Sequence, residues 1–262
     1  MKFAIFSDIH GNSVGLDAVL ADITAKGGVD HYWVLGDHIA SGPDPAGVME
    51  RLLALPNAQF IRGNTDRYIF TDARPHPHAA DVAADPTLLG QYAEIHGNFA
   101  WTTGIMAELG YFDWLRALPF DITHTLPNGV KLWGVHSSPW RDDDQTGFCP
   151  DLTQGQIEAY AAESDADLIF CGHTHWPWRV RVGKQEIINV GSIGQPRTKS
   201  MGACWTLLTE AGSSYTLELF EVSYDLQAVI DSIIAKRQPG VKYINSSYEN
   251  VRLYPWDTED RL

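Results

Sequence analysis

The first sixty residues of this 262-residue chain alternate short apolar runs with stretches of helical periodicity. Residues 3–6, 32–35 and 59–61 have the apolar pattern of buried strands. Residues 13–27 and 43–55, which lie between them, carry apolar side chains at helical spacing. Parallel strands require crossover connections of this length, which are usually helices. The sequence therefore predicts an α/β fold that opens with two βαβ units.

Strand patterns return in the second half of the chain. Residues 130–135 and 168–171 are apolar runs, and residues 178–190 and 203–222 each read as two alternating strands joined by a turn at glycine. These segments are enough to complete a sheet system around the opening βαβ units. The whole chain, residues 1–262, is expected to form a single domain.

Two segments interrupt this pattern. Residues 65–113 are rich in histidine, proline and aromatic residues and carry helical periodicity towards their end, so they predict a helical, cap-like insertion. Its aromatic side chains are interpreted either as the core of the cap or as a surface that stacks nucleobases. Residues 226–236 predict a closing helix, and residues 238–262 are expected to be an irregular tail.

Charge and cysteine content exclude several classes of protein. With 33 acidic and 19 basic residues the formal net charge is -14, which disfavours general nucleic-acid binding and binding to anionic membranes. The three cysteines are too few for a disulfide framework, and no apolar run approaches the roughly 20 residues of a membrane helix. We expect a soluble, cytoplasmic protein whose partner is a small phosphorylated molecule.

Five short motifs carry the chemistry, and each stands where a predicted strand ends. In an open α/β sheet, ligands bind beyond the carboxyl ends of the strands, so these motifs should meet in one crevice. Asp8 and His10 are two residues apart, as are His173 and His175, and strand alternation would point each pair to one side. Glycines before the polar residues allow sharp turns or close approach. The candidate metal ligands are Asp8, His10, Asp37, Asn64, His136, His173 and His175.

The donor types of these seven residues indicate which cations they suit. A mixed set of carboxylate, amide and imidazole groups favours Mn, Fe, Zn or Ni over Ca or Mg. Seven donors exceed what one ordinary site uses, whereas two divalent ions about 3.5–4 Å apart would use them all. A carboxylate can bridge two ions, and Asp37 is the candidate bridge.

The order and spacing of these motifs, DxH, GD, GN, H and GHxH, resemble the calcineurin-like metallophosphoesterase family, and in particular its small bacterial and archaeal phosphodiesterase-like branch. The resemblance implies a four-layer α/β/β/α sandwich of two mixed sheets flanked by helices. It also implies that Asp8, His10 and His175 hold the first ion, that Asn64, His136 and His173 hold the second, and that Asp37 bridges them. Asp37, Asn64 and His136 are accordingly expected to take part in catalysis.

One position departs from the family pattern. Many members have a histidine directly after the asparagine, where it contacts the phosphate or protonates the leaving group, but this chain has Thr65 followed by Asp66. A threonine cannot act as a general acid near neutral pH. His38 or solvent could replace that histidine. Other expected substrate-binding residues are Arg197, as a bidentate phosphate contact, and Asn12.

The function that follows is hydrolysis of a small phosphate diester, nucleotides included, by attack of a metal-bound hydroxide on phosphorus. A phosphomonoesterase and a dinucleoside-polyphosphate hydrolase remain alternatives that use the same ions. From a different class, a non-catalytic interaction scaffold would keep the fold without the chemistry.

Overall fold

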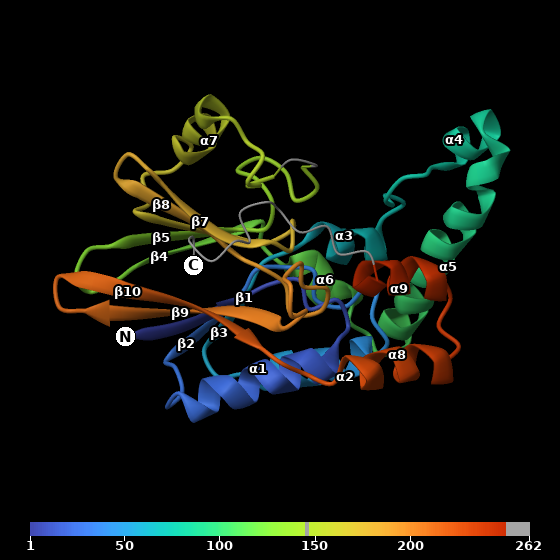
Figure 1. The fold of residues 1–262 in the computed structure, drawn as a ribbon, viewed down its shortest axis with the longest axis horizontal. Coiled ribbons are helices and arrows are strands. Elements are labelled where there is room, and N and C mark those ends of the chain that lie inside the picture. The colour runs from blue at the N-terminus through green and yellow to red at the C-terminus, as the bar shows by residue number, and fades with distance from the viewer. Residues whose placement is uncertain (145–146, 250–262) are drawn as a thin grey trace.

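Two five-stranded sheets form the centre of the protein, and the computed structural model describes residues 1–144 and 147–249 (Figure 1). The first sheet contains, in spatial order, β10 (Ser214–Val222), β9 (Ala203–Ala211), β1 (Lys2–Phe6), β2 (His31–Val34) and β3 (Ala58–Phe60). The second contains β4 (Asp121–Thr125), β5 (Lys131–Val135), β6 (Leu168–Cys171), β8 (Gln185–Val190) and β7 (Pro177–Val182). Both sheets are mixed, because each has parallel central strands and antiparallel strands at an edge.

Successive side chains of β1 point to opposite faces of the first sheet. Phe3 and Ile5 of β1 point between the sheets and pack against residues of the second sheet such as Phe170. Ala4 and Phe6 point the other way, into a core shared with the two helices that follow β1 and β2. These are α1 (Ser13–Ala25) and α2 (Pro45–Leu53), which cover the outer face of the first sheet.

The outer face of the second sheet is covered by α7 (Gln154–Ala161), whose Ile157 packs on Trp133 and Ile169 (Figure 1). The order of layers is therefore helix, sheet, sheet, helix, and the predicted four-layer sandwich is confirmed. None of the helices in the described part of the chain is long and apolar enough to cross a membrane.

All the regular secondary structure between β3 and β4 is helical. It comprises α3 (Asn64–Phe70), α4 (Ala79–Ala84), the 3-10 helix η1 (Pro86–Leu88), α5 (Leu89–Glu108) and α6 (Phe112–Ala117). Tyr68 and Phe99 are buried together at its centre, with Phe70 and Phe112 packed against them. Most of its aromatic side chains thus form a core, and Figure 1 shows α4 and the start of α5 projecting away from the sheets.

Strand β4 has no counterpart among the strands predicted from the sequence. Within Asp121–Thr125 only Ile122 is buried, because β4 is an edge strand that pairs with β5 alone. A single buried side chain among polar residues produces no recognisable apolar run.

The prediction of an irregular tail over residues 238–262 is wrong for its first part. Residues Val241–Glu249 form a helix, α9, that follows α8 (Leu226–Ala235). Ile244 and Tyr248 are buried against Val229 and Ile233 of α8, so tertiary packing stabilises a segment whose own composition is polar. Residues 250–262 lie outside the described residues.

Candidate metal centre

The seven predicted ligands come together at one end of the two sheets. Each lies in a loop that follows β1, β2, β5 or β6, or, for Asn64, at the first residue of α3 after β3. All seven side chains have most of their surface buried, and Asp8 is completely buried. The predicted convergence at the carboxyl ends of the strands therefore describes the structure well.

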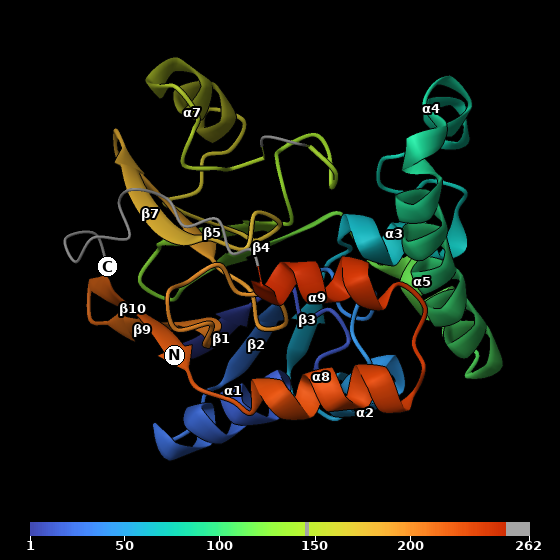
Figure 2. The ribbon, with the colours of Figure 1, turned by 45° about the vertical axis from the view of Figure 1, so that its right-hand side comes forward.

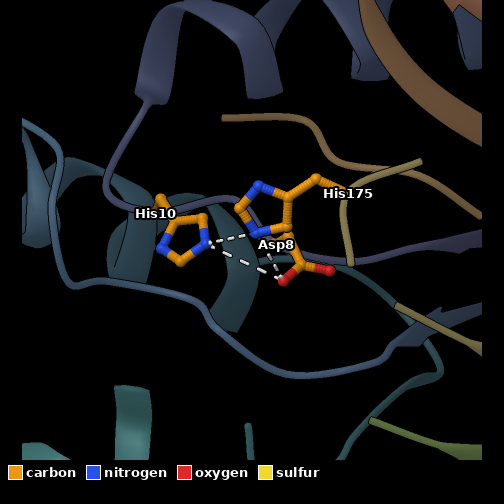
Figure 3. A group of neighbouring side chains, drawn as sticks. All are labelled: Asp8, His10 and His175. Carbon is orange, nitrogen blue, oxygen red and sulfur yellow. Dashed lines mark hydrogen bonds and ion pairs between the residues drawn. The ribbon is translucent and has the colours of Figure 1, made fainter. Parts of the chain in front are cut away.

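Asp8, His10 and His175 form the first group of donors (Figure 3). The Nε2 atoms of His10 and His175 are 3.1 Å apart, and Oδ1 of Asp8 lies 3.2 Å from Nε2 of His175 and 3.8 Å from Nε2 of His10. Three donor atoms at these distances can surround one cation.

Asn64, His136 and His173 form the second group. Oδ1 of Asn64 lies 3.1 Å from Nε2 of His136 and 3.0 Å from Nδ1 of His173. Asp37 lies between the groups, because its Oδ2 is 3.7 Å from Nε2 of His10 and 3.5 Å from Nε2 of His136. One carboxylate oxygen is thus close to both sets of donors, as a bridging ligand must be.

Backbone carbonyl groups fix which imidazole nitrogen faces the centre. Nδ1 of His10, His136 and His175 lies 3.0, 2.7 and 2.9 Å from the carbonyl oxygens of Ala40, Leu35 and Gln195, respectively. A carbonyl oxygen can only accept, so Nδ1 carries the proton and donates it. Nε2 of each ring then faces the other donors, which is the arrangement that metal-binding histidines adopt.

The hydrogen bonding of the Asp8 carboxylate indicates whether a cation fits the centre. Oδ2 of Asp8 accepts a hydrogen bond of 2.8 Å from the backbone N–H of His173, but Oδ1 is buried without a hydrogen-bond partner among the described residues. That oxygen is the one that faces His10 and His175. An isolated buried carboxylate oxygen is costly, and neighbouring lone pairs repel one another, whereas a cation satisfies them all. The donor set therefore fits divalent metal ions.

The electrostatic environment attracts positive charge. Burial raises the pKa of Asp37, yet the neighbouring imidazoles, chiefly His136, outweigh this effect and hold that pKa well below its usual range. Burial lowers the pKa of His136, but the Asp37 carboxylate raises it to a net value of about 10. For His173, burial and the neighbouring His136 lower the pKa to about 4. The centre holds its carboxylates ionised, which is the state in which they bind metals.

The ligand pairs reach the same side in a different way from the one predicted. Asp8, His10, Asp37, His173 and His175 all have left-handed backbone conformations, with φ of 54°, 50°, 54°, 66° and 66°. The strand-alternation explanation is therefore wrong, because these residues lie in turns beyond the strands. Non-glycine residues pay a cost in this conformation, and such strain concentrates at functional sites.

The glycines before the ligands allow close approach, as predicted. A Cβ atom on Gly63 would lie 2.1 Å from Oδ1 of Asp37, and one on Gly172 would lie 2.2 Å from Oγ of Ser7. Gly36 has a φ of 92° and packs directly against the backbone of Gly63. Side chains at these positions would push the ligand loops apart.

Asp66 is an organising residue that the sequence motifs did not single out. Its carboxylate accepts hydrogen bonds from the backbone N–H groups of Asp37, His38 and Gly63, at 2.9, 3.0 and 2.9 Å, and contacts Nδ1 of His38 at 2.8 Å. It is fully buried. Asp66 thus ties the loop that carries Asp37 to the start of α3, which carries Asn64.

The side chains of Asn12 and His38, the two other residues expected to bind substrate, lie inside the protein. Both side chains have no exposed surface. Asn12 caps α1, since its Oδ1 accepts from the N–H of Gly15, and its amide nitrogen donates to the carbonyl oxygen of Gly194. His38 is bound to Asp66 and packs edge-on against Trp114. These contacts support the fold, and a substrate contact by either residue stays a prediction.

Thr65 and Arg197 flank the centre. The backbone N–H of Thr65 donates to Oδ1 of Asp37 at 2.8 Å, and its hydroxyl is buried without a partner among the described residues. The backbone N–H of Arg197 donates to the carbonyl oxygen of His175 at 3.3 Å, and its guanidinium lies 4.2 Å from the centroid of the Trp176 ring. A phosphate contact by Arg197 stays a prediction.

Comparison with known proteins relates this arrangement to a family. An uncharacterized protein of Methanocaldococcus jannaschii is 26% identical over 253 residues, covering 90% of this chain and 93% of that protein. Among solved structures, a hypothetical protein of Pyrococcus horikoshii has a TM-score of 0.74 at 22% identity, covering 93% of this chain and 97% of its own. A metallophosphoesterase of Sphaerobacter thermophilus has a TM-score of 0.70 at 22% identity, covering 94% and 99%. These similarities to solved structures show a shared fold.

The family itself is shown by the sequence match. Residues 1–177 match the sequence model of the calcineurin-like phosphoesterases. That range is more than half of the chain and includes the five motifs that carry the seven candidate ligands. The chain therefore belongs to the calcineurin-like phosphoesterase family and is a metal-dependent hydrolase of phosphate esters.

Proposed function

We propose that this protein hydrolyses small phosphate diesters, nucleotides included, with two divalent transition-metal ions. Asp8, His10 and His175 would hold the first ion and Asn64, His136 and His173 the second. The observation that carries the proposal is the position of Asp37, whose Oδ2 lies within 3.7 Å of a donor nitrogen from each group. Donors that combine oxygen with imidazole nitrogen suit Mn, Fe, Zn or Ni, and manganese is the ion we propose to test first.

The ions would supply Lewis acidity, which lowers the pKa of water to near 7 and neutralises phosphoryl oxygens. The chain's own residues hold this centre in position beforehand. Asp37 keeps the two donor groups together, and the carbonyl-bound imidazoles cannot rotate without losing a buried hydrogen bond. Arg197, beside His175, is proposed to bind a phosphoryl oxygen, which would help to orient the ester for in-line attack.

The net charge supports a small substrate. At -14 the surface repels a long polyanion, so attraction for phosphate depends on the local charge of bound cations. A single phosphate ester at the centre gains that attraction without crossing an acidic surface along its whole length. We therefore propose a small cytoplasmic metabolite in preference to a polynucleotide.

The scaffold alternative is disfavoured by the completeness of the centre. A non-catalytic scaffold has no need for seven buried donors, a bridging carboxylate oxygen and an unpaired oxygen on Asp8. Such a set costs stability unless it binds cations. The monoesterase and dinucleoside-polyphosphate alternatives use the same centre and are separated from the proposal by substrate preference.

Metal removal and a substrate panel test the proposal. Bis(p-nitrophenyl) phosphate, p-nitrophenyl phosphate and a dinucleoside tetraphosphate would be supplied to protein loaded with Mn and to protein dialysed against a chelator. We expect the diester to give the highest kcat/KM, and chelation to lower it by at least about 100-fold and to lower Tm, because ions that bind the native state stabilise it. A monoester that outperforms the diester would favour the alternative, and no turnover of any ester would contradict the proposal.

A further inference from the structure

The chain crosses from the second sheet to the first between β8 and β9, in the orange loop next to β9 (Figure 2). This crossing lies beyond residues 1–177, which match the family. Its first part, residues 191–195, packs against the loop that follows β1 and carries Asp8. The two backbones are so close that a Cβ atom on Gly194 would lie 2.1 Å from the carbonyl oxygen of Ile9. The turn after β8 therefore lies directly against a ligand loop.

Ser192, in this turn, connects two parts of the first donor group. Its side chain has no exposed surface. Its Oγ donates to the carbonyl oxygen of Asp8 at 2.8 Å and accepts from the backbone N–H of Gln195 at 2.9 Å. The carbonyl oxygen of Gln195 in turn accepts from Nδ1 of His175 at 2.9 Å. One hydroxyl thus links the backbone of one candidate ligand to the group that orients another.

Both linked ligands have backbone conformations that depend on their surroundings. Asp8 and His175 are left-handed, with φ of 54° and 66°, and such conformations persist where neighbouring structure holds them. The carbonyl oxygen of Asp8 is held by two donors, Oγ of Ser192 and the backbone N–H of Gly194, each at 2.8 Å. Without the hydroxyl, the peptides of Asp8 and Gln195 would be freer to shift. The 3.2 Å between Oδ1 of Asp8 and Nε2 of His175 would then no longer be fixed.

A second buried side chain after the family match supports both donor groups. Nδ2 of Asn189, in β8, donates to the carbonyl oxygen of Gly172 at 2.6 Å and to Oγ1 of Thr174 at 3.0 Å. These two residues flank His173 of the second group, and Thr174 directly precedes His175 of the first. Asn189 therefore holds a loop that carries one ligand of each group.

The contacts of Ser192 are more selective. Among the residues that the structure describes, its hydroxyl is hydrogen-bonded to Asp8 and Gln195, which both belong to the first group or orient it. We propose that Ser192 is a positioning residue for the first metal ion, because its hydroxyl holds the Asp8 and His175 donors at the separation that one cation requires. This inference rests on the two-ion centre of the proposed function, and it does not depend on which ester is hydrolysed.

The substitution Ser192→Ala tests the inference, because it removes one oxygen and with it both hydrogen bonds. We expect one of the two Mn-binding steps, measured by calorimetry on chelator-treated protein, to weaken about 10-fold to 100-fold, and the other to stay within about twofold of the parent. A purely structural role would weaken both steps or neither. Ser192→Thr keeps the hydroxyl and should restore the weakened step towards the parent value.

Electron paramagnetic resonance of bound Mn identifies which ion is weakened. His175→Ala removes a donor of the first group, and His173→Ala removes a donor of the second. With one Mn per chain, the signal of Ser192→Ala should match that of His175→Ala, because in both proteins the ion then occupies the second group. A match to His173→Ala, or the signal of a coupled pair of ions as in the parent, would refute the assignment to the first ion.

Three further variants serve as comparisons. Ser164→Ala is the matched control: its Oγ accepts from the backbone N–H of Ala166 at 3.1 Å, at the end of β6 opposite the ligands, and its loss should leave both Mn-binding steps unchanged. Asn189→Ala should weaken both steps, since its contacts reach a loop with ligands of both groups. Ser192→Cys has a weaker donor, so it should give an intermediate affinity, and it replaces Ser192→Ala if that variant does not fold.

The outcomes separate this inference from the proposed function. If the parent binds two Mn ions and hydrolyses esters, and Ser192→Ala matches it in both binding steps, the inference is refuted and the function stands. Equal weakening of both steps also refutes it, because the hydroxyl would then serve the centre as a whole. If the parent binds two Mn ions but hydrolyses no ester, selective weakening in Ser192→Ala supports the inference and the hydrolytic function fails. A parent that binds no Mn refutes both.

Discussion

Replacing Asp37 with alanine is expected to remove both metal ions and to lower diester hydrolysis by at least about 1000-fold. Each bound ion contributes several kcal/mol of transition-state stabilisation, and about 1.4 kcal/mol corresponds to a tenfold change in rate. The Asp37 carboxylate lies against both donor groups through Oδ2, and its Oδ1 also binds the N–H of Thr65 at the start of α3. Elemental analysis of the purified variant and its diester rate measure the two effects.

Two further variants qualify the Asp37 result. Asp37→Asn keeps an oxygen acceptor for the N–H of Thr65 but loses the negative charge. It should therefore be more stable than the alanine variant, and it should bind metal more weakly than the parent protein. Asp17→Ala removes an exposed carboxylate on α1 that pairs with Arg51, and should leave metal content and activity unchanged. If Asp37→Ala still binds two ions per chain, the bridging role is refuted.

Asp66→Ala is expected to lower the free energy of unfolding by about 3–5 kcal/mol. The substitution leaves three buried backbone N–H groups without their acceptor, and each such group costs about 1–3 kcal/mol. Because these groups belong to Asp37, His38 and Gly63, metal affinity should fall as well. Urea denaturation of the chelator-treated proteins measures the stability effect without a contribution from bound metal.

Asp81→Ala is a matched control for Asp66→Ala. Asp81 accepts from the N–H of the residue three positions earlier, His78, as Asp66 does from Gly63, but that hydrogen bond is exposed to solvent. Loss of this cap should cost only about 0.5–1 kcal/mol. Equal destabilisation by the two substitutions would contradict the organising role of Asp66.

The strands that could be predicted from sequence are those whose side chains are buried without interruption. Residues Leu168–Cys171 of β6 are all buried, and the apolar run in the sequence has the same bounds. β4 and α9 were not predicted, because their structure depends on pairing with β5 and packing on α8 and leaves little local pattern. A local sequence pattern predicts an element when most of the element's own side chains are buried.

The ligands could be predicted because short motifs at strand ends combine side chains of the right chemistry. Their geometry could not, since left-handed turns at residues such as Asp8 and His173 depend on the surrounding loops. The residue that supports them was harder to find, because Asp66 accepts a hydrogen bond from the backbone N–H of Asp37, 29 positions earlier in the chain. Contacts at such separations produce no motif in the sequence.

The carbonyl oxygens that hold His10, His136 and His175 belong to the main chain. Every amino acid supplies the same oxygen, so a change of side chain at Ala40, Leu35 or Gln195 does not by itself remove the acceptor. The direction of the three rings is therefore encoded in the path of the polypeptide. Substitutions at those three positions would therefore change the direction of the rings only if they changed the course of the loops.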